Sequence, residues 1–387
     1  MSLTIISGRK ARYIQFRMWM RIAAVASRVT KNPIKLIGAV KRVKKLKKDF
    51  LSKKPLQKLV RVDNRYFWDL NQPGWPSKSF DKNFEWVIQR LIEDEKEDIE
   101  SVRMVFLAIT KKCPMNCEHC YEWDEINKKE TMDLDTLHKI VAKYQKLGAA
   151  YFILGGGEPL VRYKDLVEVL KTAKRTSDFW ISTSGFNLTL AKAQELKAAG
   201  LTGVSLSIDH FDEQANDKFR GHSQATAHIR MAAENALKAG LAVATAICAT
   251  KEFISKENMY QYAEFSKNLG AGFIWLIEPR AAGKYEGQNV QLLKAHQDIL
   301  DEFYITLNHD EKYLSYPRVI FPNYNHRAIG CAGAGTRSIM IDTDGYVNAC
   351  PFCRKKGVHA LAEDSREQVT KLLNTGCPNP LFETRPS

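Results

Sequence analysis

The chain has 387 residues with 44% hydrophobic content, which excludes a disordered tail and allows one large α/β domain with a smaller appendage. Its formal net charge is +14, but residues 1–60 carry 17 Lys and Arg against a single acid, Asp49, and the remainder is close to neutral. The charge therefore belongs to a basic arm, and the body of the chain is not expected to bind nucleic acid.

The arm, residues 1–60, is predicted to contain basic amphipathic helices over residues 13–30 and 34–48. In the first, basic residues gather toward one helical face: Lys10, Arg17, Arg21 and Arg28. This pattern is typical of a helix on an anionic membrane surface; a solvated basic helix pair and an RNA contact are the alternatives. The longest uncharged run there, residues 22–27, is far below the roughly 20 residues that cross a bilayer.

The N-terminus lacks an uninterrupted apolar segment followed by a small-residue cleavage site, so no secretory signal is expected. The eight cysteines are then expected to be reduced rather than to form disulfides. We predict a cytoplasmic protein, with peripheral attachment to the inner face of the membrane as a hypothesis. Oligomeric state is left open.

Beyond the arm, residues 61–100 are predicted to form a connector or cap. From residue 103 a glycine that ends a helical stretch is repeatedly followed by an apolar strand, at Gly148, Gly200, Gly240 and Gly270. The predicted strands are Met104–Ile109, Tyr151–Leu154, Phe179–Thr183, Val204–Ile208, Ala242–Ile247 and Phe273–Ile277. Six such units predict an α/β fold, a partial (β/α)6 TIM-type barrel, whose ligands gather at the carboxyl ends of the strands.

Three cysteines, Cys113, Cys117 and Cys120, follow the first predicted strand as C-x3-C-x2-C. Three thiolates satisfy three irons of a four-iron, four-sulfur cluster and leave the fourth iron open, whereas structural zinc normally takes four protein ligands. The pattern resembles the radical S-adenosylmethionine (SAM) superfamily, in which the amino and carboxylate groups of SAM chelate the open iron. The resemblance covers residues 101–308, which we predict to be the catalytic core.

The resemblance assigns further residues to the cofactor. Gly155-Gly156-Gly157-Glu158-Pro159 is similar to the family's GGEP motif, in which the carboxylate contacts the methionyl amine. Arg220-Gly221 stands where relatives carry an Arg-Gly pair, and its guanidinium suits the carboxylate, with an ordinary surface arginine as the alternative. The implied SAM-binding residues are His119, Tyr121, Gly156, Gly157, Glu158, Thr183, Ser207, Arg220 and Ile277.

Two other features have ordinary interpretations. Glu278 and Arg280, after the sixth predicted strand, are substrate candidates, and an internal ion pair explains them almost as well. Cys248 has no cysteine neighbour in the sequence, so we interpret it as a core residue.

The C-terminal segment, residues 309–387, is predicted to be a small Cys-rich domain built on a β-hairpin. Strands over Ser338–Ile341 and Tyr346–Ala349 flank a turn at Gly345, and four cysteines surround them: Cys331, Cys350, Cys353 and Cys377. The arrangement resembles a SPASM or twitch extension, which implies one auxiliary four-iron, four-sulfur cluster. A structural zinc site is the alternative.

The resemblance implies an enzyme that cleaves SAM reductively to a 5′-deoxyadenosyl radical and abstracts hydrogen from a peptide, a lipid-linked compound or a small metabolite. A flavodoxin- or ferredoxin-like protein would donate the electron. One alternative is a non-catalytic, zinc-stabilised protein that binds an anionic membrane or RNA through its arm. Another is a radical enzyme that modifies RNA.

Overall fold

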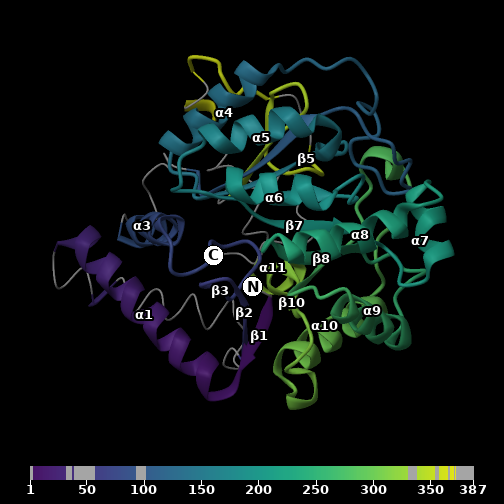
Figure 1. Cartoon of the computed structure of the whole chain (residues 1–387), viewed down its shortest axis with the longest axis horizontal. Helices are drawn as coiled ribbons and strands as arrows, with labels where there is room; N and C mark the ends of the chain where they lie inside the picture. The colour runs from purple at the N-terminus through teal and green to yellow at the C-terminus, as the bar shows by residue number, and fades with distance from the viewer. Residues whose placement is uncertain are drawn as a thin grey trace.

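The computed structural model describes residues 3–31, 37–38, 57–92, 102–329, 338–353, 357–364, 367–369 and 371. Its centre is a nine-stranded sheet in the order β10-β9-β8-β7-β6-β5-β4-β11-β12 (Figure 1). The seven strands from one edge through the middle are parallel: β4 (Met104–Thr110), β5 (Tyr151–Gly156), β6 (Asp178–Thr183), β7 (Leu201–Ser207), β8 (Ala242–Cys248), β9 (Phe273–Ile277) and β10 (Arg318–Ile320). The predicted partial parallel barrel is confirmed.

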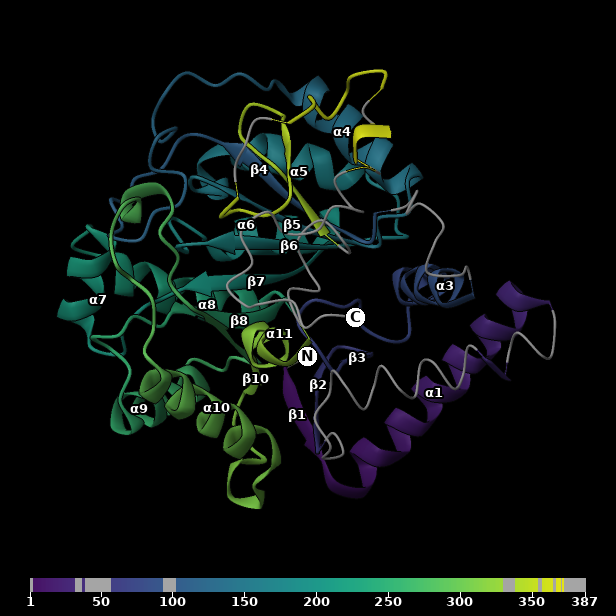
Figure 2. The ribbon, with the colours of Figure 1, turned by 180° about the vertical axis from the view of Figure 1, so that it is seen from behind.

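Helices connect the strands and cover the outer face of the sheet (Figures 1 and 2). They are α4 (Leu134–Lys146), α5 (Tyr163–Thr172), α6 (Leu190–Ala199), α7 (Glu213–Arg220), α8 (Ala225–Lys238), α9 (Lys256–Asn268) and α10 (Lys294–His309). A further helix, α11 (Pro322–Ile329), follows β10, and there are short 3-10 turns η1 (Pro159–Arg162), η2 (Gly283–Tyr285) and η3 (Glu311–Tyr313). The four junction glycines all have positive φ, between 75° and 120°, which lets each helix end sharply before the next strand.

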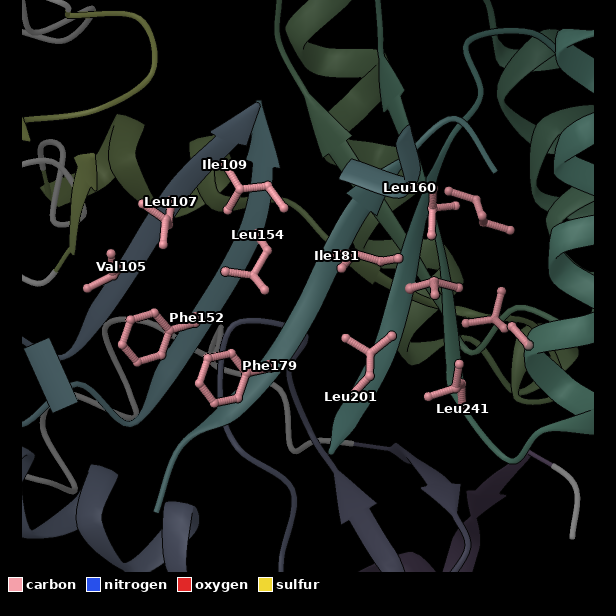
Figure 3. Packing of buried hydrophobic residues seen from close by; sticks show 14 of the residues in the cluster. Val105, Leu107, Ile109, Phe152, Leu154, Leu160, Phe179, Ile181, Leu201 and Leu241 are labelled. Atoms are coloured by element: carbon pink, nitrogen blue, oxygen red, sulfur yellow. The ribbon is translucent and has the colours of Figure 1, made fainter. Parts of the chain in front are cut away.

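Alternate residues of each strand face the helices and form the main core. Figure 3 shows this layer, in which Leu107, Leu154 and Ile181 of neighbouring strands pack side by side and Phe152 stacks on Phe179 with ring centroids 4.9 Å apart. The intervening residues point to the concave face of the half barrel, so both faces of the parallel strands are apolar, as such strands require.

The N-terminal unit, residues 3–31 and 57–92, fills the amino-terminal half of the concave face. It contains β1 (Thr4–Ser7), α1 (Gly8–Thr30), β2 (Lys58–Val62), β3 (Arg65–Phe67) and α3 (Lys78–Ile92), and the three strands form an antiparallel sheet. Phe67 lies edge-on against Trp180, whose ring packs in turn on Phe273. These side chains take the place that inward residues of the missing strands would fill in a closed barrel.

Polar contacts also fix the N-terminal unit at the ends where the parallel strands begin. Arg65 forms an ion pair with Asp178, the first residue of β6. Lys197 donates to Asp63 Oδ2 at 2.7 Å and to the carbonyl of Gly240, just before β8, at 2.5 Å. The amino ends of the strands are therefore covered, and functional groups are expected at the opposite, carboxyl ends.

The predicted helical arm is only partly a helix, because the segment begins and ends as strands. One face of α1 packs on α3 and on Trp68, burying Ala11, Ile14, Met18, Ile22, Val25 and Ala26. The second predicted helix, over residues 34–48, falls almost wholly outside the described residues. No described helix is long and apolar enough to cross a membrane.

The sheet does not stop at the predicted core boundary, residue 308. β10 pairs with β9, and β11 (Ser338–Ile341) pairs in parallel with β4, so the C-terminal segment continues the sheet at both edges. β12 (Val347–Asn348) pairs antiparallel with β11, and the predicted turn glycine, Gly345, has φ +83°. The C-terminal hairpin is therefore built into the core sheet instead of forming a detached domain.

Candidate functional site

The three predicted cluster cysteines lie together on the loop after β4, at the carboxyl end of the strands. Cys117 is buried, Cys113 and Cys120 are half-buried, and all three pack with Met115, Phe186 and Ala225 in one small apolar cluster. The loop is held by backbone hydrogen bonds, in which the amides of Asn116 and Glu118 donate to the last carbonyls of α7, each at 3.0 Å. The geometry gathers the three cysteines at one site, and their ligation of a cluster stays a prediction.

The thiols are in a setting that favours ligation. Burial raises the pKa of Cys113 and Cys120 to about 12, so unligated thiols are neutral there and a metal cluster is what makes them thiolates. Arg220 is buried, and its Nη1 lies 3.4 Å from Cys117 Sγ. Three soft sulfur donors beside one guanidinium fit an anionic iron–sulfur cluster. Within the described residues, no group of three or more His, Cys, Asp or Glu side chains converges on a single metal ion; thiolates that each bind a different iron of a cluster need not converge in this way.

Asp209, directly after β7, organises the groups around the cysteine loop. Its carboxylate lies 2.8 Å from Arg220 Nε and 2.9 Å from His119 Nε2, and it accepts a hydrogen bond from the amide of Cys248 at 2.8 Å. Burial by itself would raise the pKa of Asp209, but Arg220 and His119 lower it to about 2. Asp209 is not among the site residues predicted from the sequence. The signal in the sequence that could have identified Asp209 is a carboxylate directly after a predicted strand.

His119, one of the predicted SAM-binding residues, contacts two neighbouring elements of the protein. Besides its bond to Asp209, its ring lies against Phe219 with centroids 5.2 Å apart. His119 therefore connects the cysteine loop to β7 and α7.

Arg220 is no ordinary surface residue, because its side chain is only 8% exposed.

Glu158, at the end of β5, is buried and surrounded by donors. Oε1 accepts from the Leu160 amide at 3.0 Å and Thr183 Oγ1 at 2.6 Å, and Oε2 accepts from the amide and hydroxyl of Ser184 at 2.7 and 2.6 Å. Burial raises the pKa of Glu158, while these hydrogen bonds act in the opposite direction. The structure thus brings together Glu158 and Thr183, which are both predicted to bind SAM, and adds Ser184, for which no role is predicted from the sequence.

The glycines before Glu158 allow two backbone segments to meet. Gly156 has φ +114°, and a Cβ there would lie 2.6 Å from the Thr110 carbonyl oxygen; a Cβ on Gly157 would lie 2.3 Å from that of Lys112. The amides of Gly157 and Glu158 donate to those same carbonyls, each at 2.8 Å. Close packing on the start of the cysteine loop is therefore sufficient to require glycine at both positions.

Three other predicted cofactor residues lie at the ends of strands or in loops on the same side of the barrel, where the parallel strands end. Tyr121 packs edge-on between Phe106 of β4 and Phe352 of the C-terminal segment, with centroids 6.4 and 6.2 Å away. Ser207 ends β7, and Ile277 ends β9, where its carbonyl accepts from the Ala249 amide at 2.9 Å. Their contacts with SAM stay predictions.

Of the predicted auxiliary ligands, Cys350 and Cys353 form a tight turn in which the Cys353 amide donates to the Cys350 carbonyl at 3.1 Å. Cys331 and Cys377 lie outside the described residues. An unpredicted contact ties this segment to the cysteine loop, since buried Lys111 forms ion pairs with Asp344 of the hairpin at 2.6 Å and with Glu125 at 2.9 Å. The hairpin is thereby fixed beside the candidate site.

Glu278 forms an internal ion pair, as the ordinary interpretation predicts, but its partner is not Arg280. Its carboxylate accepts from Arg327 Nη1 at 2.5 Å, and Arg327 also pairs with Asp301. Cys248 is half-buried at the end of β8.

The fold and the site define an open parallel β/α barrel with a thiol-lined cofactor site at its carboxyl end. Residues 107–262 match the family described as the Radical SAM superfamily. The matching segment contains the cysteine loop and the strand ends from β5 to β8. Members of that family use a four-iron, four-sulfur cluster and SAM, which is the pair of cofactors predicted from the sequence.

Similar proteins agree with this assignment. A probable GTP 3′,8-cyclase of Pyrococcus abyssi is 34% identical over 109 residues, covering 28% of this chain and 35% of that protein. A probable GTP 3′,8-cyclase of Archaeoglobus fulgidus is 32% identical over 108 residues, covering 28% and 36%. The chain thus spans about a third of the length of the curated relatives it matches.

Solved structures with low sequence identity share the fold. Streptococcus suis SuiB bound to precursor peptide SuiA superposes with a TM-score of 0.56 at 14% identity, covering 84% of this chain and 75% of that one. Native anSMEcpe with bound AdoMet and a Cp18Cys peptide gives 0.53 at 17% identity, covering 70% and 80%. Both likenesses extend beyond the segment that matches the family.

Proposed function

We propose that this chain binds a four-iron, four-sulfur cluster through Cys113, Cys117 and Cys120 and uses it to generate a radical from SAM. The observation that carries the proposal is the gathering of one buried and two half-buried thiols beside Arg220 at the carboxyl end of the parallel strands. When bound, the reduced cluster supplies one electron to the sulfonium, which gives methionine and a 5′-deoxyadenosyl radical that takes a hydrogen atom from substrate. The protein supplies position, charge and exclusion of water.

Arg220 has two roles in this proposal. Through Nη1 it places positive charge beside Cys117, and through Nε it is held by Asp209. Nη2 is the nitrogen that we propose for the carboxylate of the methionyl part, because the other two face protein partners. Asp209 and His119 are positioning residues that hold Arg220 and the cysteine loop in register.

The contacts of Glu158 sharpen its proposed role. A carboxylate offers about four acceptor sites, and four protein donors already occupy those of Glu158. A methionyl ammonium must therefore replace one donor. We propose that it replaces the Ser184 hydroxyl, which can rotate away, while the Leu160 and Ser184 amides and Thr183 keep the carboxylate in place.

The C-terminal cysteines are proposed to hold one auxiliary cluster, with Cys350 and Cys353 supplying two of four ligands. What supports this is the attachment of the hairpin to the cysteine loop through Lys111 and Asp344, which keeps both cysteine groups on one side of the barrel. The other two ligands would be Cys331 and Cys377. A flavodoxin- or ferredoxin-like electron donor completes the proposal.

For the substrate we propose a peptide, lipid-linked compound or small metabolite. The match to the two GTP 3′,8-cyclases covers about a third of their length. A match of that extent does not favour GTP as the substrate. Peptide-bound SuiB and anSMEcpe support a peptide only through the fold.

Anaerobic reconstitution followed by iron and sulfide analysis tests the proposal. About eight irons per chain are expected for two clusters and about four for the first cluster alone. With dithionite and SAM, the wild type should form 5′-deoxyadenosine, Cys117→Ala should form none, and Cys248→Ala is the matched control that should retain the activity. Stoichiometric zinc at the cysteines, or equal 5′-deoxyadenosine from wild type and Cys117→Ala, would contradict the proposal.

A further inference from the structure

Helix α1 has an outward face that is unlike the surface of the rest of the molecule. Tyr13, Phe16 and Met20 follow one another at spacings of three and four, so they share one stripe, and they are 61%, 62% and 58% exposed. Eight large hydrophobic side chains are exposed in the described chain, and three of them are in this stripe. Ala23 and Ala24 extend it toward the end of the helix.

The charge around this stripe has one sign. No acidic residue precedes Asp49 in the sequence, and Arg9, Lys10 and Arg12 are exposed on the first turns of α1. The face that sequence periodicity predicted for membrane contact is in part used inside the protein, because Arg21 pairs with Asp81 and Arg28 lies 3.5 Å from Glu85 of α3. The available basic residues therefore flank the apolar stripe near its beginning.

The stripe lies where a flat surface can reach it. Figures 1 and 2 show α1 along the outer edge of the molecule, separated from the barrel by the rest of the N-terminal unit. Its 23 residues extend for about 35 Å. Because this unit covers the amino ends of the parallel strands, a surface bound to α1 leaves the cysteine loop at the opposite end uncovered.

We infer that α1 docks the protein onto an anionic lipid bilayer. Tyr13, Phe16 and Met20 enter the headgroup region, and Arg9, Lys10 and Arg12 bind lipid phosphates. An apolar centre flanked by cations is the pattern of an interfacial helix. RNA fits this face less well, since its phosphates would be matched by basic residues along the centre of the stripe. The inference is independent of the radical chemistry.

Co-sedimentation of the full-length, reconstituted protein with vesicles tests the inference. The vesicles contain phosphatidylcholine either alone or with a quarter phosphatidylglycerol. The test variant is Phe16→Ser with Met20→Ser, and the control is Leu293→Ser with Met231→Ser, which removes two exposed hydrophobic side chains elsewhere. The wild type and the control should bind the anionic vesicles, and the test variant should lose at least about tenfold in partition coefficient.

Two further measurements, the thermal midpoint and the formation of 5′-deoxyadenosine, accompany the vesicle-binding assay. Thermal midpoints should match among the three proteins, because all four substituted side chains are exposed. Formation of 5′-deoxyadenosine should also be unchanged, so a failure of the radical chemistry is recognised separately. Undiminished vesicle binding by the test variant, absence of vesicle binding by the wild type, or binding to a short single-stranded RNA in place of vesicles would each overturn the inference.

Discussion

The buried pair of Asp209 and Arg220 should behave as one energetic unit. Their ionised groups are 2.8 Å apart, and the side chains are 2% and 8% exposed. At an effective dielectric constant of about 20, the attraction at that distance is about 6 kcal/mol, and most of it offsets the cost of burying both charges. Removing one partner leaves the other buried and uncompensated, which typically costs about 3–5 kcal/mol.

A double-mutant cycle measures this coupling. Arg220→Met and Asp209→Asn should each lower the free energy of unfolding by about 3 kcal/mol. The double variant should lose no more than either single one, which gives a coupling energy of about 3 kcal/mol. Denaturant unfolding under anaerobic, reducing conditions, followed by tryptophan fluorescence, is the assay. The exposed pair of Glu234 and Lys238, 2.6 Å apart, is the control, and its coupling should stay below about 0.5 kcal/mol.

The pH dependence of this cycle has a defined sign. The pKa of Asp209 is lowered from 3.8 to about 2 in the folded chain, so the stabilisation is complete above pH 4 and is lost as the pH falls toward 2. The coupling should therefore be constant between pH 6 and 8. Additive single substitutions, or a coupling no larger than that of the control pair, would refute the interpretation of Asp209 as the group that holds Arg220.

Other substitutions test the surrounding site. Glu158→Gln places an amide NH2 among donors and should weaken SAM binding at least tenfold, measured by equilibrium dialysis, with a stability loss of about 2 kcal/mol. Gly157→Ala puts a Cβ 2.3 Å from the Lys112 carbonyl oxygen, so the cysteine loop must shift, and iron bound after reconstitution should fall by more than half. Lys111→Met removes a buried cation from between the half-buried carboxylates of Asp344 and Glu125 and should cost about 2 kcal/mol. Faster proteolysis of the C-terminal segment is the readout, and an unchanged cleavage rate would contradict the coupling.

The parallel strands were predictable because their signals are local. Each unit can be recognised in the sequence by an apolar run and by a glycine such as Gly148 or Gly200, whose positive φ ends the preceding helix. The cysteine loop was predictable for the same reason, since three thiols within eight residues need no knowledge of the fold. Strand ends then place the remaining candidates on one side.

The links between distant segments were not predictable. Asp209 meets His119 across 90 positions, and Lys111 meets Asp344 across 233, and no periodicity encodes such pairings. The face of α1 was ambiguous for a different reason, because an amphipathic helix has the same pattern whether its apolar side meets protein or lipid. Packing on α3 uses one side of α1, and only the structure shows that a second apolar stripe remains.

The concave face is apolar where the strands begin and polar where they end. This division explains how the barrel strands are covered although the barrel is open. Near their beginnings the strands carry Tyr151, Trp180 and Phe273, which the N-terminal unit covers with Phe67. Near their ends they carry the polar groups that surround the cysteine loop, including Asp209. The apolar half has no other cover in the described chain, so the barrel strands depend on the N-terminal unit to bury this surface. The N-terminal unit therefore completes the apolar core, and it also keeps α1 at the end of the barrel opposite the candidate site.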